Sequence, residues 1–212
     1  MSTHAVWYFD VISPFAYLHW QRIKALRDCT FELRPILFAG LLTLHGHKGP
    51  AEIPGKRLFS YRHVQWRAQR DGIAFTFPPA HPFSPVTALR LCLAAGATPD
   101  AVDTVFDFIW REGRLPDTPE RIAALAARLG IADPAAALED ADVRATLQRN
   151  FDRAVQDGVF GVPTVLVDGQ VFWGEDATDM FLDYLDNRAL FDTPEMRRLA
   201  ELPVGAVRKP AG

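Results

Sequence analysis

Cysteine is scarce in this chain. Only Cys29 and Cys92 are cysteines among 212 residues, and they lie far apart in the sequence. Two widely separated cysteines fit thiols of a reducing compartment better than they fit a disulfide framework. We therefore expect both side chains to be inert parts of the packing.

A strong charge of either sign is also missing. The 23 lysines and arginines nearly balance the 26 aspartates and glutamates, which leaves a net charge of −3. This balance gives no electrostatic reason to expect a nucleic acid or an acidic membrane surface as a partner. The first residues lack the basic start and apolar run of a signal peptide, and no apolar run is long enough to cross a membrane. We expect a cytoplasmic protein.

Several common active-site motifs are absent as well. The chain has no G-x-S-x-G elbow, no P-loop and no dinucleotide fingerprint, so nothing in it supports a hydrolase or a nucleotide enzyme. His45 and His47 are separated by one residue, but no pattern of further Cys, His or carboxylate ligands accompanies them. A solvated loop explains the two histidines better than a metal site.

Apolar residues, by contrast, make up 49% of the chain, which is enough for one elaborated core or for two small domains. Residues 5–9 are apolar or aromatic without alternation, as in a strand covered on both faces of a mostly parallel sheet. A helix is predicted to begin at Ser13 and Pro14. Residues 31–38 indicate a second strand with an edge or irregular portion at Pro35. These elements form one β-α-β unit.

The middle of the chain is predicted to be a loop followed by helices. Residues 40–54 have the composition of a loop, and helices are predicted over residues 56–70 and 143–157. Apolar residues at helical spacing predict another helix that includes residues 102–109. Four capping side chains stand directly before prolines and predict further helix starts, at Ser84, Thr98, Thr118 and Asp133.

The last part of the chain returns to β-structure. Asp168 and Gly169 separate two apolar runs, which predicts a β-hairpin, and a helix is expected to follow from Gly174 onward. A short helix and a loose tail are expected after Asp192. The element order predicts an α/β fold in which a thioredoxin-like domain, residues 1–40 and 159–212, is split by an inserted all-helical domain, residues 41–158.

Ser13 is the first candidate for chemistry, and two interpretations compete. As a plain N-cap before Pro14 it would resemble Ser84 and imply no chemistry. The first helix of a thioredoxin-like domain is, however, where redox members carry a reactive cysteine, because a helix N-terminus stabilises a thiolate. Residues 13–16 (SPFA) contain no cysteine, which excludes dithiol exchange there. A hydroxyl at this place can donate a hydrogen bond to the thiolate of another molecule, and this points to glutathione.

The bond between Val162 and Pro163 is the second candidate. A trans proline that opens a strand is the common case, since only a few per cent of X-Pro bonds are cis. The position of this bond before the hairpin favours cis, because such a bend would expose the backbone of Val162 to an extended peptide. Glutathione is such a peptide.

Residues 173–176 (WGED) are the third candidate. A strand end, a turn and a helix cap would explain Gly174 and Asp176 fully. In a functional interpretation, the N–H groups of this helix start hold the γ-glutamyl carboxylate of glutathione, and Glu175 or Asp176 meets its amine. Both interpretations can hold together.

Basic and aromatic residues of the middle region are weaker candidates. Lys48, Lys56 or Arg57 could meet an anionic substrate, although a surface role is the commoner fate of any single one. Phe83 belongs to a group of aromatic residues after residue 60 that could wall a pocket, although aromatic residues at this density more often form core.

Four stretches in order resemble 2-hydroxychromene-2-carboxylate isomerases, which are relatives of kappa-class glutathione transferases and of DsbA-like thiol-disulfide oxidoreductases. The stretches are residues 9–18 (FDVISPFAYL), 47–57 (HKGPAEIPGKR), 160–164 (FGVPT) and 172–176 (FWGED). Each is of limited specificity alone, and the four in order are specific for the superfamily. The resemblance spans nearly the whole chain before the tail.

The resemblance implies glutathione as cofactor and Ser13 as the residue that activates it. It also implies glutathione contacts from Val162 and Pro163 and from Trp173, Gly174, Glu175 and Asp176. Family members interconvert 2-hydroxychromene-2-carboxylate and trans-o-hydroxybenzylidenepyruvate during the breakdown of naphthalene-like aromatics. We further expect a homodimer that acts on a small aromatic carboxylate.

One position departs from the family pattern. Naphthalene-pathway members carry a substrate-contacting lysine in the loop after the second strand, and the nearest counterpart in this chain is Leu42. Lys48 or Lys56 is the candidate replacement, and His47 and Phe83 complete the predicted substrate side. This departure bears on the substrate more than on the cofactor.

Two alternatives stay open. A kappa-like glutathione transferase or peroxidase would consume glutathione, whereas an isomerase would regenerate it. A non-catalytic thioredoxin-like binding module would have kept only the scaffold.

Overall fold

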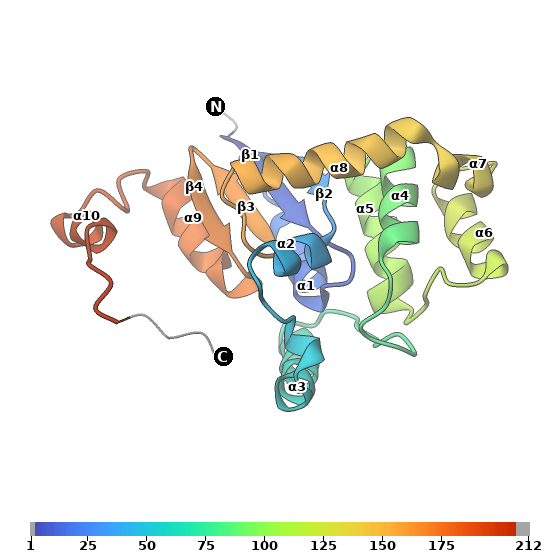
Figure 1. Cartoon of the computed structure of the whole chain (residues 1–212), viewed down its shortest axis with the longest axis horizontal. Helices are drawn as coiled ribbons and strands as arrows, with labels where there is room; N and C mark the ends of the chain where they lie inside the picture. Colours follow the sequence, from blue (N-terminus) through green and yellow to red (C-terminus); the bar gives the residue numbers. More distant parts are fainter. Residues whose placement is uncertain (1–2, 207–212) are drawn as a thin grey trace. The chain divides into compact units, whose positions relative to one another are not determined.

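The computed structural model describes residues 3–206, in which a region of helices lies to one side of a β-sheet (Figure 1). Among these residues four strands form one sheet in the order β2-β1-β3-β4. β1 (Thr3–Phe9) pairs in parallel with β2 (Cys29–Pro35) and antiparallel with β3 (Thr164–Val167), which pairs antiparallel with β4 (Gln170–Trp173). The sheet is therefore mixed and not mostly parallel, because the chain returns from the helices as a hairpin.

β1 is covered on both faces, as its unalternating apolar sequence predicts. Trp7, Tyr8 and Phe9 are all fully buried. On one face the Trp7 ring stacks on Phe9 and on Trp20, with ring centroids 4.4 and 5.1 Å apart. On the opposite face Tyr8 packs in a cluster that includes Ile36. β2 lies at the edge of the sheet and ends at Pro35, which suits a residue that cannot donate to a ladder.

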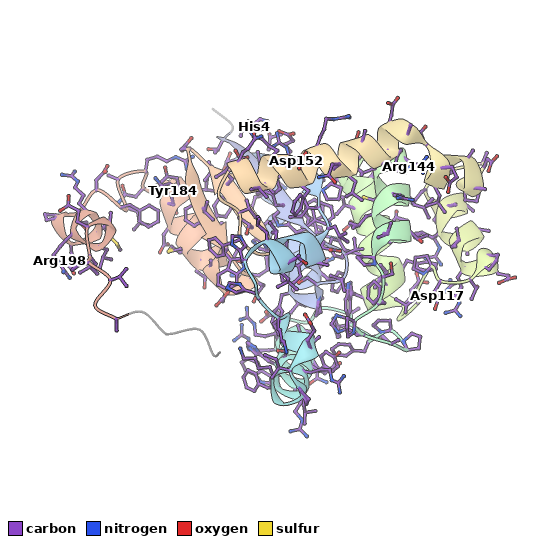
Figure 2. All side chains as sticks on the ribbon, in the orientation of Figure 1. His4, Asp117, Arg144, Asp152, Tyr184 and Arg198 are labelled. Carbon is purple, nitrogen blue, oxygen red and sulfur yellow. The ribbon has the colours of Figure 1, made fainter. Side chains whose placement is uncertain are left out.

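The helical region follows β2 and returns to the sheet through α8. In Figure 1, α8 extends from the neighbourhood of α7 past α4 to the sheet, and it packs against α4 and β2. Its charged residues Arg144 and Asp152 are exposed (Figure 2). Within this region the structure describes α3 (Pro54–Arg70), α4 (Val86–Ala94), α5 (Pro99–Phe106), the π-helical turn η2 (Asp107–Arg111), α6 (Pro119–Arg128), α7 (Pro134–Glu139) and α8 (Ala141–Gln156). The helix predicted to include residues 102–109 is thus split between α5 and η2.

Three of the four predicted proline-marked helix caps are confirmed. Thr98, Thr118 and Asp133 each accept a hydrogen bond from a backbone N–H of the first turn. A helix does begin near Ser84, as predicted, because α4 starts at Val86; the capping role of Ser84 is wrong, because the cap position is Pro85 and no side chain caps the helix. A hydroxyl before proline is therefore not sufficient for a cap.

The loop predicted over residues 40–54 is also partly wrong. The helix α2 (Phe38–Leu44) covers its start, and a short 3₁₀ turn, η1 (Pro50–Glu52), interrupts the rest. α2 has no capping side chain of its own at Leu37. Asp10, from the end of β1, accepts a hydrogen bond from Phe38 N–H at 2.8 Å instead. Because this partner comes from a distant part of the sequence, the local pattern does not reveal the helix start.

The hairpin prediction is confirmed in detail. Asp168 and Gly169 have φ values of 50° and 77°, and both lie in the left-handed region that a two-residue hairpin turn of this type requires. A short 3₁₀ turn, η3 (Glu175–Ala177), follows β4 and leads into α9 (Thr178–Asp186). The predicted order of elements is present, and the fold is thioredoxin-like with a helical insertion.

The chain divides after Thr178 into two compact units. The second unit contains most of α9 together with α10 (Pro194–Ala200), and within it Tyr184 stacks on Phe191 at 5.5 Å. This confirms the short helix after Asp192, while the predicted tail extends past residue 206, outside the described residues. The division does not test the predicted domain boundaries at residues 41 and 158, which stay predictions.

No helix in the described part of the chain is both long and apolar enough to span a membrane. Both cysteine side chains are buried, Cys29 in β2 and Cys92 in α4. Burial raises the pKa of the Cys92 thiol to about 12, which suits an inert packing residue.

Candidate functional site

The site lies at the end of the two central strands, where β1 ends and β3 begins. The two strands are antiparallel, and Tyr8 of β1 stands opposite Thr164 of β3. The residues after Phe9 and the residues before Thr164 therefore leave the sheet at the same edge. This register brings the residues directly after Phe9 close to the residues directly before Thr164, which include the Val162–Pro163 bond.

Ser13 is the N-cap of α1 (Pro14–Ile23), as its sequence predicts. Its Oγ accepts a hydrogen bond from Ala16 N–H at 3.2 Å, and its φ of −87° and ψ of 114° are those of an extended cap residue. The residue is half-buried. A hydroxyl that accepts one hydrogen bond still has its own proton to donate. The helix end adds a positive partial charge, so an anion is favoured beside this hydroxyl.

Asp10 is a feature of the site that sequence reasoning left without a role. It is fully buried, and its Oδ1 and Oδ2 accept hydrogen bonds from Ile12 N–H at 3.0 Å and Phe38 N–H at 2.8 Å. The carboxylate thus ties the residues before Ser13 to the start of α2. Burial raises the pKa of the Asp10 carboxyl to about 7, and the two N–H donors act in the opposite direction. The sequence feature that could have revealed this role of Asp10 is an acidic residue directly after an apolar strand.

The peptide bond between Val162 and Pro163 is cis, as its position before the hairpin favours. Pro163 O accepts a hydrogen bond from Gly174 N–H at 2.9 Å, which joins this bend to the end of β4. Among residues 3–206, neither the N–H nor the C=O of Val162 has a hydrogen-bond partner. The backbone of Val162 is therefore available to pair with an extended peptide.

Trp173 covers the bend from the side of β4. Its side chain is half exposed, and its ring meets the Phe160 ring edge to face at 5.1 Å. A Cβ on Gly161 would overlap the Trp173 ring, so only glycine allows this approach. The stretches 160–164 and 172–176 thus form one surface.

Glu175 and Asp176 have different surroundings. The Glu175 side chain is buried and forms ion pairs with Arg22 of α1, at 3.1 Å, and with Arg67 of α3. Asp176 is exposed, and its Oδ1 lies against Gly174, whose φ of 95° favours glycine. Glu175 therefore anchors η3 to two helices, and Asp176 is the acid of this stretch that faces solvent.

Comparison with known proteins agrees with this arrangement. Residues 6–186 match the family model of the DSBA-like thioredoxin domain. A 2-hydroxychromene-2-carboxylate isomerase of Pseudomonas putida is 31% identical over 184 residues, which cover 80% of this chain and 87% of the relative. The chain belongs to the DSBA-like thioredoxin domain family, in its 2-hydroxychromene-2-carboxylate isomerase branch.

Two further proteins are similar to this chain, one in structure and one in sequence. A solved structure of a 2-hydroxychromene-2-carboxylate isomerase has the same fold, with a TM-score of 0.76 at 24% identity over 95% of this chain and all of that one. Glutathione S-transferase kappa 2 of Caenorhabditis elegans is 25% identical over 201 residues, which cover 84% of this chain and 89% of the relative. The isomerase branch is thus close to the kappa transferases in sequence.

The residues predicted for the substrate side of this family member are spread over three segments. His47 and Lys48 are exposed after α2, Lys56 is exposed in the first turn of α3, and Phe83 is half-buried before α4. In the described part of the chain, none of the three basic side chains forms a hydrogen bond or ion pair with Ser13. Leu42, at the position where the family pattern has a lysine, is half-buried in α2.

No group of three or more His, Cys, Asp or Glu side chains suited to a metal ion occurs among residues 3–206. The His45 and His47 rings lie 5.8 Å apart on the surface of the loop after α2.

Proposed function

We propose that this protein is a glutathione-dependent isomerase that interconverts 2-hydroxychromene-2-carboxylate and trans-o-hydroxybenzylidenepyruvate. The observation that carries the proposal is the Ser13 hydroxyl at the N-terminus of α1, in the segment that leaves the sheet where β3 begins. Just before β3, the backbone of Val162 has no hydrogen-bond partner among residues 3–206. A hydroxyl at a helix end suits a thiolate supplied by another molecule, and an unpaired backbone suits an extended peptide. Glutathione has both features.

The Ser13 hydroxyl would donate a hydrogen bond to the sulfur of the bound tripeptide, and the end of α1 would stabilise the negative charge of the thiolate. Bound glutathione supplies a thiolate that adds reversibly to the conjugated alkene of the ring-opened substrate, so that the former double bond can rotate before the thiolate leaves. Residues 13–16 lack a cysteine that could form a mixed disulfide in competition with this addition.

The peptide part of glutathione has a separate set of contacts in the proposal. Val162 pairs with the cysteinyl backbone of the tripeptide, and Trp173 covers it from the side. The exposed carboxylate of Asp176 meets the γ-glutamyl amine. Glu175, with its carboxylate already paired to Arg22 and Arg67, holds η3 in place for these contacts.

The substrate carboxylate is assigned to the basic residues on the other side of the site. Lys48, Lys56 and His47 are exposed and available to an anion, and Phe83 offers an aromatic face. Lys48→Ala and Lys56→Ala should raise the KM for the aromatic substrate and leave the KM for glutathione unchanged. Equal KM values for both variants and the wild type would remove the two lysines from this assignment.

The homodimer is also a proposal. Exposed apolar side chains on α3, Leu58, Phe59 and Trp66, support a protein partner on this helix. Sedimentation equilibrium should give twice the mass of one chain, and a monomer at all accessible concentrations would contradict it.

The decisive experiment follows isomerisation by ultraviolet absorbance with and without glutathione while total free thiol is measured. We expect turnover that depends on glutathione and leaves the amount of free thiol constant. Turnover without any thiol, or no turnover with it, would contradict the proposal.

A kappa-like transferase or peroxidase is the second candidate, and the similarity to the kappa 2 transferase of Caenorhabditis elegans favours it. Such an enzyme consumes free thiol in proportion to product, so the same assay separates it from an isomerase. A non-catalytic thioredoxin-like binding module would replace both candidates if isothermal titration showed no glutathione binding at millimolar concentration.

A further inference from the structure

Two consecutive peptide groups precede Ser13, and hydrogen bonds hold both the N–H and the C=O of each. In the first group, between Val11 and Ile12, Val11 O accepts a hydrogen bond from Trp110 Nε1–H at 2.8 Å. The N–H of the same group donates to Asp10 Oδ1 at 3.0 Å. Rotation of this peptide plane would therefore break two hydrogen bonds at once.

The second peptide group, between Ile12 and Ser13, is held in the same way. Its N–H donates to the backbone oxygen of Asp10 at 3.1 Å. Its C=O, at Ile12, lies 2.9 Å from Nε2 of His81. The orientation of this plane sets the position of the Ser13 Cα, and hence the direction in which the hydroxyl points. His81 is 69 residues from Ile12 in the sequence, so no local pattern reveals the contact.

The two side chains that hold the carbonyl groups differ in their surroundings. Trp110 belongs to the π-helical turn η2 and is fully buried. Such turns often occur at functional sites. His81 is half-buried, and its ring faces Trp110 and Phe83 at 5.6 and 6.0 Å. His81 is thus the replaceable member of the pair, whereas Trp110 is part of the core.

Ile12 O and Tyr61 hold the His81 ring from its two nitrogen atoms. Ile12 O can only accept a hydrogen bond, so His81 Nε2 must carry the proton that joins them. The Tyr61 hydroxyl lies 2.8 Å from His81 Nδ1 and 2.7 Å from His81 O, and in the neutral ring Nδ1 is an acceptor. Burial lowers the pKa of His81, which favours this neutral form. Ile12 O thus requires the tautomer in which Nε2 carries the proton, and Tyr61 of α3 holds the ring in place through its contacts with Nδ1 and His81 O.

We propose that His81, oriented by Tyr61, is a positioning residue that aims the Ser13 hydroxyl at the thiol of the bound cofactor. This inference rests on the proposed function, because it assigns His81 to the same site. His81 acts through the Ile12–Ser13 peptide group and does not itself touch the reacting atoms. Its loss should therefore lower kcat and raise the pKa of the bound thiol, with little effect on the KM for glutathione.

The test measures the pKa of bound glutathione from thiolate absorbance, together with kcat and KM, in the full-length chain. His81→Phe removes the donor and keeps an aromatic ring; we expect a thiol pKa about one unit higher and kcat lower by about 10-fold or more. His81→Gln keeps an amide N–H near the place of Nε2 and should recover part of the loss. Tyr61→Phe should give a smaller change in the same direction.

His4→Phe is the matched control, because His4 is an exposed residue of β1 (Figure 2) that contacts neither Ile12 nor Ser13. It should leave the thiol pKa and kcat unchanged. If His81→Phe is folded and keeps the wild-type thiol pKa and kcat, the inference is wrong, whatever its melting temperature. If His81→Phe does not fold, Tyr61→Phe decides by the same criterion.

The wild-type chain separates this inference from the proposed function. If it shows no thiolate signal with glutathione, the proposed function fails and the positioning role fails with it. If it shows the signal and the variants do not alter it, only the positioning role fails.

Discussion

Helices α1 and α5 begin with the same local pattern, yet only one of the two helix ends lies at the candidate site. Ser13 Oγ accepts from Ala16 N–H at 3.2 Å, and Thr98 Oγ1 accepts from Ala101 N–H at the same distance. In both helices proline follows the cap. The hydroxyl and the proline therefore serve helix initiation in each case, and they do not distinguish a site from an ordinary helix start.

The difference lies in the first turn and in what surrounds it. α5 has Asp100 in its first turn, whereas α1 has no acid there. At α5 a side chain of the protein places negative charge at the positive end of the helix. The first turn of α1 has no such charge, which favours the proposed thiolate there. Ser13 is also preceded by two peptide groups that are held by hydrogen bonds at both ends. The two helix ends therefore differ in the charge of the first turn and in the surrounding residues, and not in the cap itself.

The largest expected effect comes from removing the two cap hydroxyls in parallel. Ser13→Ala should lower kcat by about 10²–10³-fold, the usual loss when a donor to a developing or resident anion is removed. Thr98→Ala should leave kcat unchanged. Both variants should lose about 1 kcal/mol of unfolding free energy, because each loses a cap. Steady-state kinetics and urea unfolding measure the two effects; full turnover in Ser13→Ala would remove the chemical difference between the two helix ends.

The buried Asp10 predicts that the stability of the protein depends on pH. An acid whose pKa is about 7 in the folded state and 3.8 in the unfolded state binds more protons when folded. Its contribution to stability is full below the unfolded pKa and is lost as the pH rises through the folded pKa, by at most about 1.4 kcal/mol per pH unit.

Asp10→Asn removes this titration. The unfolding free energy of the wild type, minus that of the variant, should therefore fall as the pH is raised from about 4 to about 7. Urea unfolding at several pH values measures this difference, with Asp100→Asn as the exposed counterpart in α5. A difference that stays constant over this range would show that Asp10 titrates as an ordinary acid.

Asp10 also illustrates how far sequence reasoning reaches in this molecule. The strands, the hairpin, the caps at Thr98 and Thr118 and the order of elements follow from patterns within a few residues, where propensity and turn geometry act. α2 was missed because its first N–H group, that of Phe38, donates to Asp10, a residue far away in the sequence. Ser84 was misassigned because the same letters occur one residue too early for a cap.

The site shows the same limit. Ser13 and the cis bond before Pro163 could be anticipated from their places before a helix and a hairpin. The ion pairs of Glu175 and the hydrogen bond from His81 to Ile12 join segments far apart in sequence. Such contacts depend on how the helices and strands pack, and no local pattern in a single sequence predicts them.

A further test introduces an acidic residue into the first turn of α1, at the position that corresponds to the acid of α5. Phe15 occupies the second helical position of α1, which corresponds to Asp100 of α5. Phe15→Asp should disfavour the bound thiolate by about 0.3–2 kcal/mol, because a carboxylate then occupies the anion-favouring end of the helix. The measurements are the thiol pKa of bound glutathione, which should rise, and kcat, which should fall.

Phe15→Asn is the control for this change. The Phe15 ring packs against His63 at 5.8 Å, so any substitution removes that contact. Only the aspartate adds charge. An equal rise of the thiol pKa in both variants would assign the effect to packing and not to the helix end.

The smallest effect is expected from the reverse change at α5. Asp100→Asn removes the acid from the first turn and should cost about 0.3–1 kcal/mol of unfolding free energy at low salt, since an exposed charge near a helix N-terminus contributes about this much. Added salt should reduce the cost, because screening weakens the interaction. The variant should leave the thiol pKa and kcat unchanged, since Asp100 belongs to a helix end that no ligand uses. A change in kcat as large as the change in stability would show that the two helix ends are coupled. The acidic residue in the first turn would then not explain the difference between α5 and α1.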